Sequence, residues 1–303
     1  VVVLSHNGMD VDRKLASLVP GIDLILGGHT HDGVPVPVEI ENSGGKTVDT
    51  NAGSNGKFLA VIDIEFSATR VAGYRHRMLP VFSNLLPADR DMAWYIEQVR
   101  APYADKLNEE LSVADSLLYR RGNFNGTFDQ LICDGLRQQL DAEIALSPGF
   151  RWGTTVVPGE AITMDRLLDQ TCMTYPETYV RDMAGSELKM ILESVADNVF
   201  NPDPYYQQGG DMVRTGGLQY SCDPLAKMGE RIGDLTLASG KAVEADKTYK
   251  VSGWATVGSE APGAPVWEVV ADYLRDQKTV RIDKLESPTL KNVSGNPGIS
   301  DYG

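Results

Sequence analysis

The sequence predicts an α/β fold in two parts joined by a long helix. Short apolar runs alternate with Gly- and Asn-rich turns up to about residue 82, a charged amphipathic segment follows, and strands alternate with helices from about residue 112. With 303 residues, 42% of them hydrophobic, the chain is long enough for two separate cores. We therefore expect a first domain over 1–87, a linker helix over 88–111, a second α/β domain over 112–285 and an irregular tail over 286–303.

The first part reads strand, helix, strand. The apolar runs VVVLS and DLILGG flank the amphipathic segment DVDRKLASLV, and this order predicts two parallel strands joined by a helix. FLAVIDIEF and HRMLPVF predict further, antiparallel strands between turn-rich stretches such as ENSGGKT and NAGSNGK. The chain opens on Val1 in the middle of a hydrophobic run, so we expect it to be a fragment of a longer protein.

The linker and the second part follow from helical spacing and caps. ADRDMAWYIEQVRAPYADKLNEEL predicts the linker helix with Asp89 as its N-cap, and Pro102 should kink or split it. Thr127 is expected to cap the helix FDQLICDGLRQQL, which leads into the strand AEIALS. The helix SELKMILESVADNVF, the strands DLTLAS and TYKVSGW and the helix VWEVVADYL complete the second part.

Charge and cysteine usage exclude several classes of partner. The net charge of −14 would repel the phosphates of nucleic acid, and no apolar run approaches the roughly 18 residues of a membrane-spanning helix. We therefore expect neither a nucleic-acid nor a membrane partner. Cys133, Cys172 and Cys222 lack the CxxC spacing of zinc or redox sites. A disulfide between Cys172 and Cys222 is possible, whereas Cys133 is expected in a helix core.

Three of the four histidines follow the ends of the first two predicted strands. His6 stands in SHNG, and His29 and His31 stand in GGHTHD. Ligands gather at the carboxyl ends of parallel strands, and residues two apart on a strand point the same way. Imidazole suits manganese, zinc or iron better than magnesium or calcium. We expect these three histidines to converge on a metal site, although each alone could be an ordinary loop residue, and we expect His76 to lie outside the site.

These motifs resemble those of a known family. SHNG followed by GGHTHD is similar to the last two metal-binding motifs of calcineurin-like metallophosphoesterases, in the branch of the 5′-nucleotidases. RRGNFNGTFDQLICDGL, DAEIALSPGFRWG and EADKTYKVSGW resemble the second domain of the same branch. The resemblance implies that the first part is the C-terminal portion of a metallophosphoesterase αββα sandwich, followed by a linker helix and a 5′-nucleotidase-type C-terminal α/β domain.

The resemblance also implies a di-metal site of which this chain holds only part. It implies two divalent metal ions, manganese by expectation with zinc or iron as alternatives. His6 and His29 match two ligands of one ion, and His31 matches a ligand of the other. The Asp-x-His, bridging Asp and Asn-His motifs of the family have no counterpart here, and Asp12 and Asp32 are better explained as cap or turn residues. We therefore expect this chain alone to be inactive.

A narrower resemblance covers essentially the whole chain. YRRGNFNGTFDQLICD, QTCMTYPETYVRDM, YYQQGGDMVR and LKNVSGNPGISDY resemble thiosulfohydrolases of the SoxB type. This implies a periplasmic hydrolase of the Sox sulfur-oxidation pathway, which releases sulfate from a cysteine-S-thiosulfonate on a SoxYZ-type carrier protein by a di-metal hydroxide mechanism.

Two other functions stay open. A 5′-nucleotidase or related metallophosphoesterase acting on nucleotides is the alternative, although YPETYV and GSEAPGAP stand where nucleotidases carry the aromatic clamp for the base. A binding module whose histidines have lost their role is the third possibility.

Five residues of the second part are candidates for substrate binding. Arg151, in SPGFRWG, matches the family's substrate-binding arginine, and its planar fork can hold two oxyanion oxygens; it is our candidate catalytic residue, with a surface ion pair as the alternative. Arg214, in GGDMVRTGG, is a second candidate. Asn123 and Asn125 can donate to a substrate, although Asn beside Gly commonly forms a turn. Tyr175 can line a channel for a protein arm, although aromatic residues commonly pack in cores.

Overall fold

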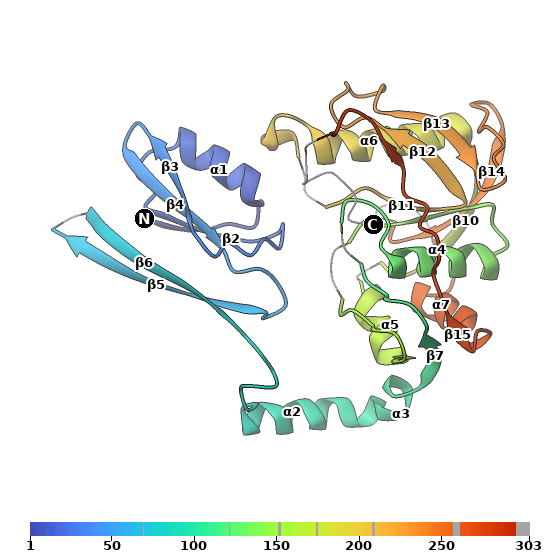
Figure 1. Cartoon of the computed structure of the whole chain (residues 1–303), viewed down its shortest axis with the longest axis horizontal. Coiled ribbons are helices and arrows are strands. Elements are labelled where there is room, and N and C mark those ends of the chain that lie inside the picture. Colours follow the sequence, from blue (N-terminus) through green and yellow to red (C-terminus); the bar gives the residue numbers. More distant parts are fainter. Residues whose placement is uncertain are drawn as a thin grey trace. The chain divides into compact units, whose positions relative to one another are not determined.

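The computed structural model describes residues 1–303 except positions 69, 121, 151–152, 174, 208–209, 257–260 and 295–303. The chain forms two compact units. Unit 1 comprises Val1–Val99 and Asn201–Gly209, and unit 2 comprises Arg100–Phe200 and Gly210–Gly303. Figure 1 draws the first 99 residues, which form most of unit 1, from blue to teal, and unit 2 mainly from green to red. The α/β class predicted from the sequence is confirmed.

Unit 1 is built on a four-stranded sheet with the order β1-β2-β4-β3. Its elements are β1 (Val2–Leu4), α1 (Met9–Leu18), β2 (Leu24–Gly27), β3 (Val38–Asn42), β4 (Gly45–Asn51), β5 (Phe58–Ser67), β6 (Arg70–Pro80) and α2 (Arg90–Arg100). The strands β1, β2 and β4 are parallel, and β3 pairs antiparallel with β4. α1 packs on this sheet and buries Ala16. The predicted strand–helix–strand unit is confirmed.

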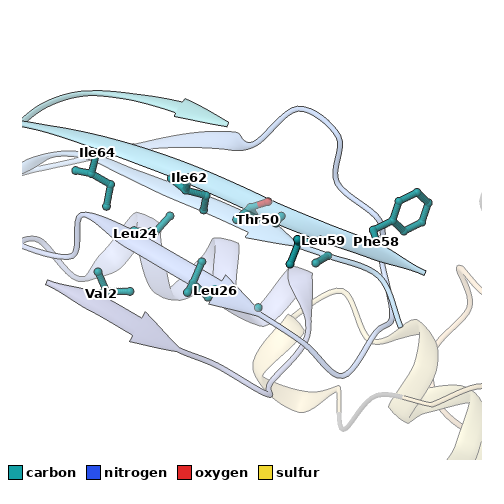
Figure 2. Close-up of a pocket in the computed structure, with 11 residues that line it drawn as sticks. Val2, Leu24, Leu26, Thr50, Phe58, Leu59, Ile62 and Ile64 are labelled. Carbon is teal, nitrogen blue, oxygen red and sulfur yellow. The ribbon is translucent and has the colours of Figure 1, made fainter. Parts of the chain in front are cut away.

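The hairpin of β5 and β6 leaves an open apolar space against this sheet. The two strands pair antiparallel along nearly their whole length. A cavity of about 560 Å³ lies between β5 and the sheet, and Figure 2 shows side chains such as Leu24, Leu26 and Ile62 lining it from both sides. Nearby apolar side chains remain in solvent, with Leu59 58% exposed and Phe66 74% exposed. The interior of unit 1 is therefore only partly closed.

The linker is divided at Pro102, as its sequence predicts. The carboxylate of Asp89 accepts from the Met92 N–H at 2.9 Å and caps α2. A 3-10 turn, η1 (Ala101–Tyr103), then separates α2 from the short α3 (Ala104–Leu107). Proline has no N–H to donate to the preceding turn, which explains the break. No residue of α2 is buried.

Unit 2 is a layered α/β unit. After α3 its elements are β7 (Glu110–Ala114), α4 (Thr127–Gln139), β8 (Ile144–Ser147), β9 (Ala161–Thr163), α5 (Met164–Thr171), β10 (Thr178–Ala184), α6 (Gly185–Phe200), β11 (Arg214–Gly216), β12 (Leu218–Cys222), β13 (Ile232–Leu237), β14 (Thr248–Trp254), α7 (Val266–Arg275), β15 (Thr279–Val280) and β16 (Thr289–Leu290). The central sheet has the order β10-β14-β8-β11, with β14 and β8 parallel. Two three-stranded sheets, β13-β12-β16 and β15-β7-β9, complete it.

The central sheet separates two apolar cores. One cluster contains Phe128 of α4 and Ala145 of β8, and the other contains Leu192 of α6 together with Ile144 and Leu146 of β8. Because alternate residues of a strand face opposite sides, β8 is buried on both faces. Cys133 lies fully buried in the first cluster, as predicted.

The helix cap of α4 differs from its sequence expectation. α4 begins at Thr127, and its N-cap is Gly126, whose N–H donates to Asp129 Oδ2 at 2.9 Å. The Thr127 hydroxyl instead donates to the Leu117 carbonyl at 2.6 Å. Asp129, three positions after the cap, therefore binds the N–H of the cap residue, as the N3 residue of a capping box does.

The tail and the cysteines also differ from expectation. Thr289–Leu290 forms a strand that pairs with β12, so the segment 286–303, predicted to be irregular, contains one short strand. All three cysteines are free, with Cys172 exposed and Cys222 buried, which excludes the disulfide considered from the sequence. No helix of the described residues is long and apolar enough to cross a membrane.

Candidate functional site

His6 and His29 lie side by side just beyond the ends of the parallel strands β1 and β2. Their ring centroids are 5.1 Å apart, with 64° between the ring planes. The N–H of Ser5 donates to the Leu26 carbonyl at 3.0 Å and extends the pairing of the two strands up to the histidine loops. Since imidazole nitrogens bind divalent ions at about 2.0–2.1 Å, this separation fits two ligands of one ion. The structure thus brings two of the three expected histidines together, and their role as metal ligands stays a prediction.

The loop after β2 has a geometry that the sequence did not indicate. β2 ends at Gly27, and His29 and His31 have φ values of 71° and 58°, in the left-handed region. Alternation along a strand therefore does not apply here, and it gives no reason for these two side chains to point the same way. Among the described residues no group of three His, Cys, Asp or Glu is placed to hold a metal. The participation of His31 stays a prediction.

Two glycines allow the two histidine loops to approach each other. A Cβ on Gly28 would lie 3.1 Å from His6 Nδ1. A Cβ on Gly8 would lie only 2.8 Å from Thr30 Cγ2, and the φ of Gly8 is 98°. Gly8 therefore requires the absence of a side chain, whereas a side chain at Gly28 would crowd the His6 ring.

Two buried carboxylates accompany these loops. Asp12 of α1 and Asp49 of β4 are fully buried, and a Cβ on Gly27 would lie 3.1 Å from Asp12 Oδ2 and 3.7 Å from Asp49 Oδ1. Burial raises the pKa of Asp12. Burial, and after it the charge of Asp12, raise the pKa of Asp49 to about 6, while Arg13 opposes the rise. In the described part of the chain, neither Asp49 oxygen has a hydrogen-bond partner.

The structure gives Asp12 and Asp49 environments that the sequence did not indicate. Asp12 is not a cap, because the N-cap of α1 is Gly8; its Oδ1 instead accepts from the Ser5 hydroxyl at 2.5 Å. Asp49 was missed. Its signal was the alternation in KTVDTN, which places Asp49 on the same strand face as the buried Thr47. His76 lies on β6, with Nε2 3.4 Å from the Thr50 hydroxyl.

Unit 2 has a cleft at the carboxyl ends of its parallel strands β8 and β14. The cavity measures about 380 Å³, and its lining includes Leu146, Ser147, Phe150, Asp211, Val213, Trp254 and Thr256. Trp254 Nε1 donates to Ser147 Oγ at 2.8 Å, which ties the two strand ends together. Ligands of α/β sheets bind at such strand ends, so this cleft is the candidate substrate site of unit 2.

Arg214 lies beside this cleft but is fully buried. One of its terminal nitrogens donates to Asp211 Oδ2 at 3.1 Å and to the Gly122 carbonyl at 2.9 Å, and its Nε lies 3.5 Å from Asp129 Oδ2. In this conformation the guanidinium is engaged by protein groups. Its Nη1 has no hydrogen-bond partner among the described residues, and its contact with a substrate stays a prediction.

Arg120 is a second buried arginine, which sequence reasoning missed. Its Nε donates to Asp129 Oδ1 at 2.7 Å, and its terminal nitrogens donate to the carbonyls of Gln170 and Pro148 at 2.5 and 3.0 Å. It therefore fixes the Pro148–Phe150 loop of the cleft to α4 and to the end of α5. The paired arginines in YRRG were its only signal in the sequence.

The remaining candidates occupy different environments. Asn125 is buried, donates to the Thr215 carbonyl at 2.8 Å and accepts from the Thr215 N–H at 3.3 Å, so its amide joins the start of α4 to β11. Asn123 is half-buried, and its carbonyl accepts from the Met212 N–H at 3.2 Å. Tyr175 is 45% exposed. Arg151 lies outside the described residues.

The chain is similar to nucleotidases and to SoxB. Residues 112–268 match the family described as 5′-nucleotidase, C-terminal domain. The structure of the sulfate thiohydrolase SoxB of Thermus thermophilus, solved with glycerol, aligns with a TM-score of 0.88 at 38% identity, over 96% of this chain and 54% of that one. A 5′-nucleotidase precursor, also from Thermus thermophilus, aligns with a TM-score of 0.80 at 22% identity, over 96% of this chain and 64% of that one, and shares the fold.

Two curated relatives are also similar to most of this chain. The trifunctional nucleotide phosphoesterase YfkN of Bacillus subtilis (strain 168) is 28% identical over 88% of this chain and 19% of its own length. The 5′-nucleotidase of Bos taurus is 22% identical over 83% of this chain and 49% of its own length. The chain thus spans half or less of these two relatives.

Proposed function

Because the chain belongs to the 5′-nucleotidase family, we propose that it functions in a metal-dependent hydrolase of the SoxB type. The proposed reaction releases sulfate from a cysteine-S-thiosulfonate on a SoxYZ-type carrier protein in the periplasm. The single observation that carries the metal-dependent part is the His6–His29 pair, with ring centroids 5.1 Å apart at two parallel strand ends. The SoxB assignment is supported by 38% identity over 96% of the chain.

The residues present fit part of a di-metal site. When bound, two divalent ions, manganese by our proposal, supply an activated water and positive charge to the sulfonate. His6 and His29 would hold one ion through imidazole nitrogens, and His31 would serve the other. Gly28 keeps the space beside His6 free of a side chain.

The proposed substrate contains three sulfur atoms in a row: the cysteine sulfur, a second sulfur bound to it, and the sulfonate sulfur. The reaction cleaves the bond between the second sulfur and the sulfonate sulfur. The oxygen of water bonds to the sulfonate sulfur, and the electron pair of the broken S–S bond stays on the sulfur attached to the carrier cysteine. The products are sulfate, a proton and a cysteine persulfide on the carrier. In the proposal, Arg151 binds sulfonyl oxygens through its planar fork.

A 5′-nucleotidase activity is the second candidate. It is favoured by the relatives that act on nucleotides, which match over 83% to 88% of the chain. It is disfavoured by the lining of the unit 2 cleft, where the described aromatic residues Phe150 and Trp254 approach edge to face at 6.3 Å. This arrangement does not form the parallel pair of rings that would stack on both faces of a base.

The deciding experiment compares two products from one preparation. Full-length protein is supplied in turn with Mn²⁺, Zn²⁺ or Fe²⁺, and sulfate release from a thiosulfonated carrier is measured beside phosphate release from AMP. We expect sulfate release, lost in His6→Ala and retained in His76→Ala, with residues 1–303 alone inactive. Phosphate release without sulfate release would establish the nucleotidase instead. Neither product from metal-loaded protein would favour a binding module.

A further inference from the structure

The loop that carries His6 is fixed at both of its ends by residues that are not predicted ligands. At its start, the Ser5 hydroxyl donates to Asp12 Oδ1 at 2.5 Å. At its end, the Met9 N–H donates to Thr30 Oγ1 at 3.3 Å. His6 therefore stands between one anchor on α1 and another on the opposite histidine loop.

Thr30 joins the two loops through both of its side-chain branches. It directly follows His29, and its hydroxyl accepts from the Met9 N–H while donating to Asp32 Oδ2 at 2.5 Å. Its methyl carbon occupies the space beside Gly8, where a Cβ would lie 2.8 Å away. A shift of either loop would break the hydrogen bond or open this contact.

The anchor at Asp12 is unusual because a carboxylate rarely lies fully buried without several partners. Asp12 is 0% exposed, and its Oδ2 has no partner within the described residues, so the hydrogen bond from Ser5 is its main stabilising contact. The Ser5 oxygen in turn accepts from the Asn7 backbone N–H at 3.3 Å and from Asn7 Nδ2 at 3.0 Å. Ser5 thus fixes the backbone on both sides of His6.

We propose that Thr30 and Asp12 are positioning residues, which hold His6 and His29 in their edge-to-face arrangement before any ion binds. The identity of the ion as a divalent transition metal rests on the proposed function, but the positioning itself does not. Ligands that are already in place lose less conformational freedom on binding. Loss of such outer contacts typically weakens metal binding by about 10- to 100-fold.

Two matched pairs of variants isolate the contact between the loops. Thr30→Val keeps the shape of the side chain and removes the hydroxyl, whereas Thr30→Ser keeps the hydroxyl. Met9→Pro removes the N–H donor at the first helical position, where proline is tolerated, and Met9→Ala keeps that donor. Ser5→Ala removes the anchor to Asp12.

The first readout needs no metal. In the chain with labelled histidines, we expect a nuclear Overhauser effect between the rings of His6 and His29, retained in Thr30→Ser and Met9→Ala and lost or strongly weakened in Thr30→Val, Met9→Pro and Ser5→Ala. The second readout is the Zn²⁺ dissociation constant, expected to rise about 10- to 100-fold in the same three variants. Circular dichroism confirms that each variant is folded.

The outcomes separate the two proposals. An unchanged ring contact in folded Thr30→Val and Met9→Pro would overturn the positioning role, whatever the zinc affinity. A ring contact that depends on these anchors, in a protein whose histidines bind no zinc, would leave positioning intact and remove the proposed metal function. If Thr30→Val fails to fold, Met9→Pro decides, because it changes no atom of Thr30.

Discussion

Unit 1 and unit 2 differ in what fills their interiors. The two apolar core clusters found among the described residues both lie in unit 2, where helices cover both faces of the central sheet. In unit 1, the buried positions around the sheet are largely polar, and they include Asp12, Thr47, Asp49 and Asn51. The other side of that sheet opens into the apolar cavity of about 560 Å³.

The difference indicates a division of roles. Burying carboxylates and amides without full hydrogen bonding is unfavourable, whereas burying aliphatic side chains is favourable. The apolar clusters of unit 2 therefore stabilise the sheet whose strand ends form its cleft. In unit 1, by contrast, the buried polar groups near the histidine pair lower the stability of the fold.

The largest effect should come from the unit 2 core. Phe128 is fully buried, so Phe128→Ala should lower the free energy of unfolding by about 3–5 kcal/mol. Leu59→Ala, at a site in unit 1 that is 58% exposed, should change it by less than about 0.5 kcal/mol. Hydrogen exchange in peptides from each unit, during urea unfolding, measures both. Equal losses of unfolding free energy in Phe128→Ala and Leu59→Ala would mean that unit 1 has a closed core of its own.

A somewhat smaller effect is expected from the buried arginine of unit 2. Arg120→Met leaves Asp129 buried with fewer partners and should destabilise unit 2 by about 3 kcal/mol. Because Arg120 also donates to the Pro148 carbonyl, exchange of the Pro148–Phe150 loop should rise together with that of α4. The double variant Arg120→Met with Asp129→Asn should recover part of the loss. A loss below about 0.5 kcal/mol would show that this ion pair contributes little.

Replacing the buried carboxylate of Asp49 in unit 1 should raise the free energy of unfolding, whereas the two core substitutions in unit 2 should lower it. The folded-state pKa of Asp49, about 6, lies above its ordinary value of 3.8, so the folded state keeps a proton that the unfolded state releases. Stability should therefore fall as pH rises from about 4 to 6 and stay low above that range. Asp49→Asn removes this penalty and should stabilise unit 1 at pH 7.5, by at most about 3 kcal/mol.

The control for this variant is Asp63→Asn on β5, where the carboxylate is 54% exposed. Thermal unfolding of both variants at pH 4 and pH 7.5 gives the answer. The increase in melting temperature caused by Asp49→Asn should be small at pH 4 and larger at pH 7.5. A gain that does not depend on pH would exclude titration of Asp49 as its cause.

The sequence predicted those features that depend on local pattern. The apolar runs ending in Gly and His placed His6 and His29 at neighbouring strand ends, because parallel strands end at the same edge of a sheet. Pro102 marked the break in the linker for a similarly local reason. The positions of His29 and His31 in the left-handed region were not predictable, since histidine does not require that conformation.

Features that depend on distant partners were not predictable either. Arg214 was a candidate for substrate binding, but Asp211 and Asp129 hold its guanidinium in the interior. The spacing of Asp129 from Arg214 in the chain gave no sign of this pairing. The burial of Asp49 likewise depends on α1 and Asp12, which lie far from it in the sequence.

The most direct test of the account is the ligand shell of a bound ion. X-ray absorption at the zinc edge, on the zinc-loaded chain, should show imidazole nitrogens at about 2.0–2.1 Å. This imidazole contribution should fall in both His6→Ala and His29→Ala and stay unchanged in His76→Ala. A spectrum without imidazole, or one that is the same in His6→Ala and the wild type, would contradict the assignment of the metal site to unit 1.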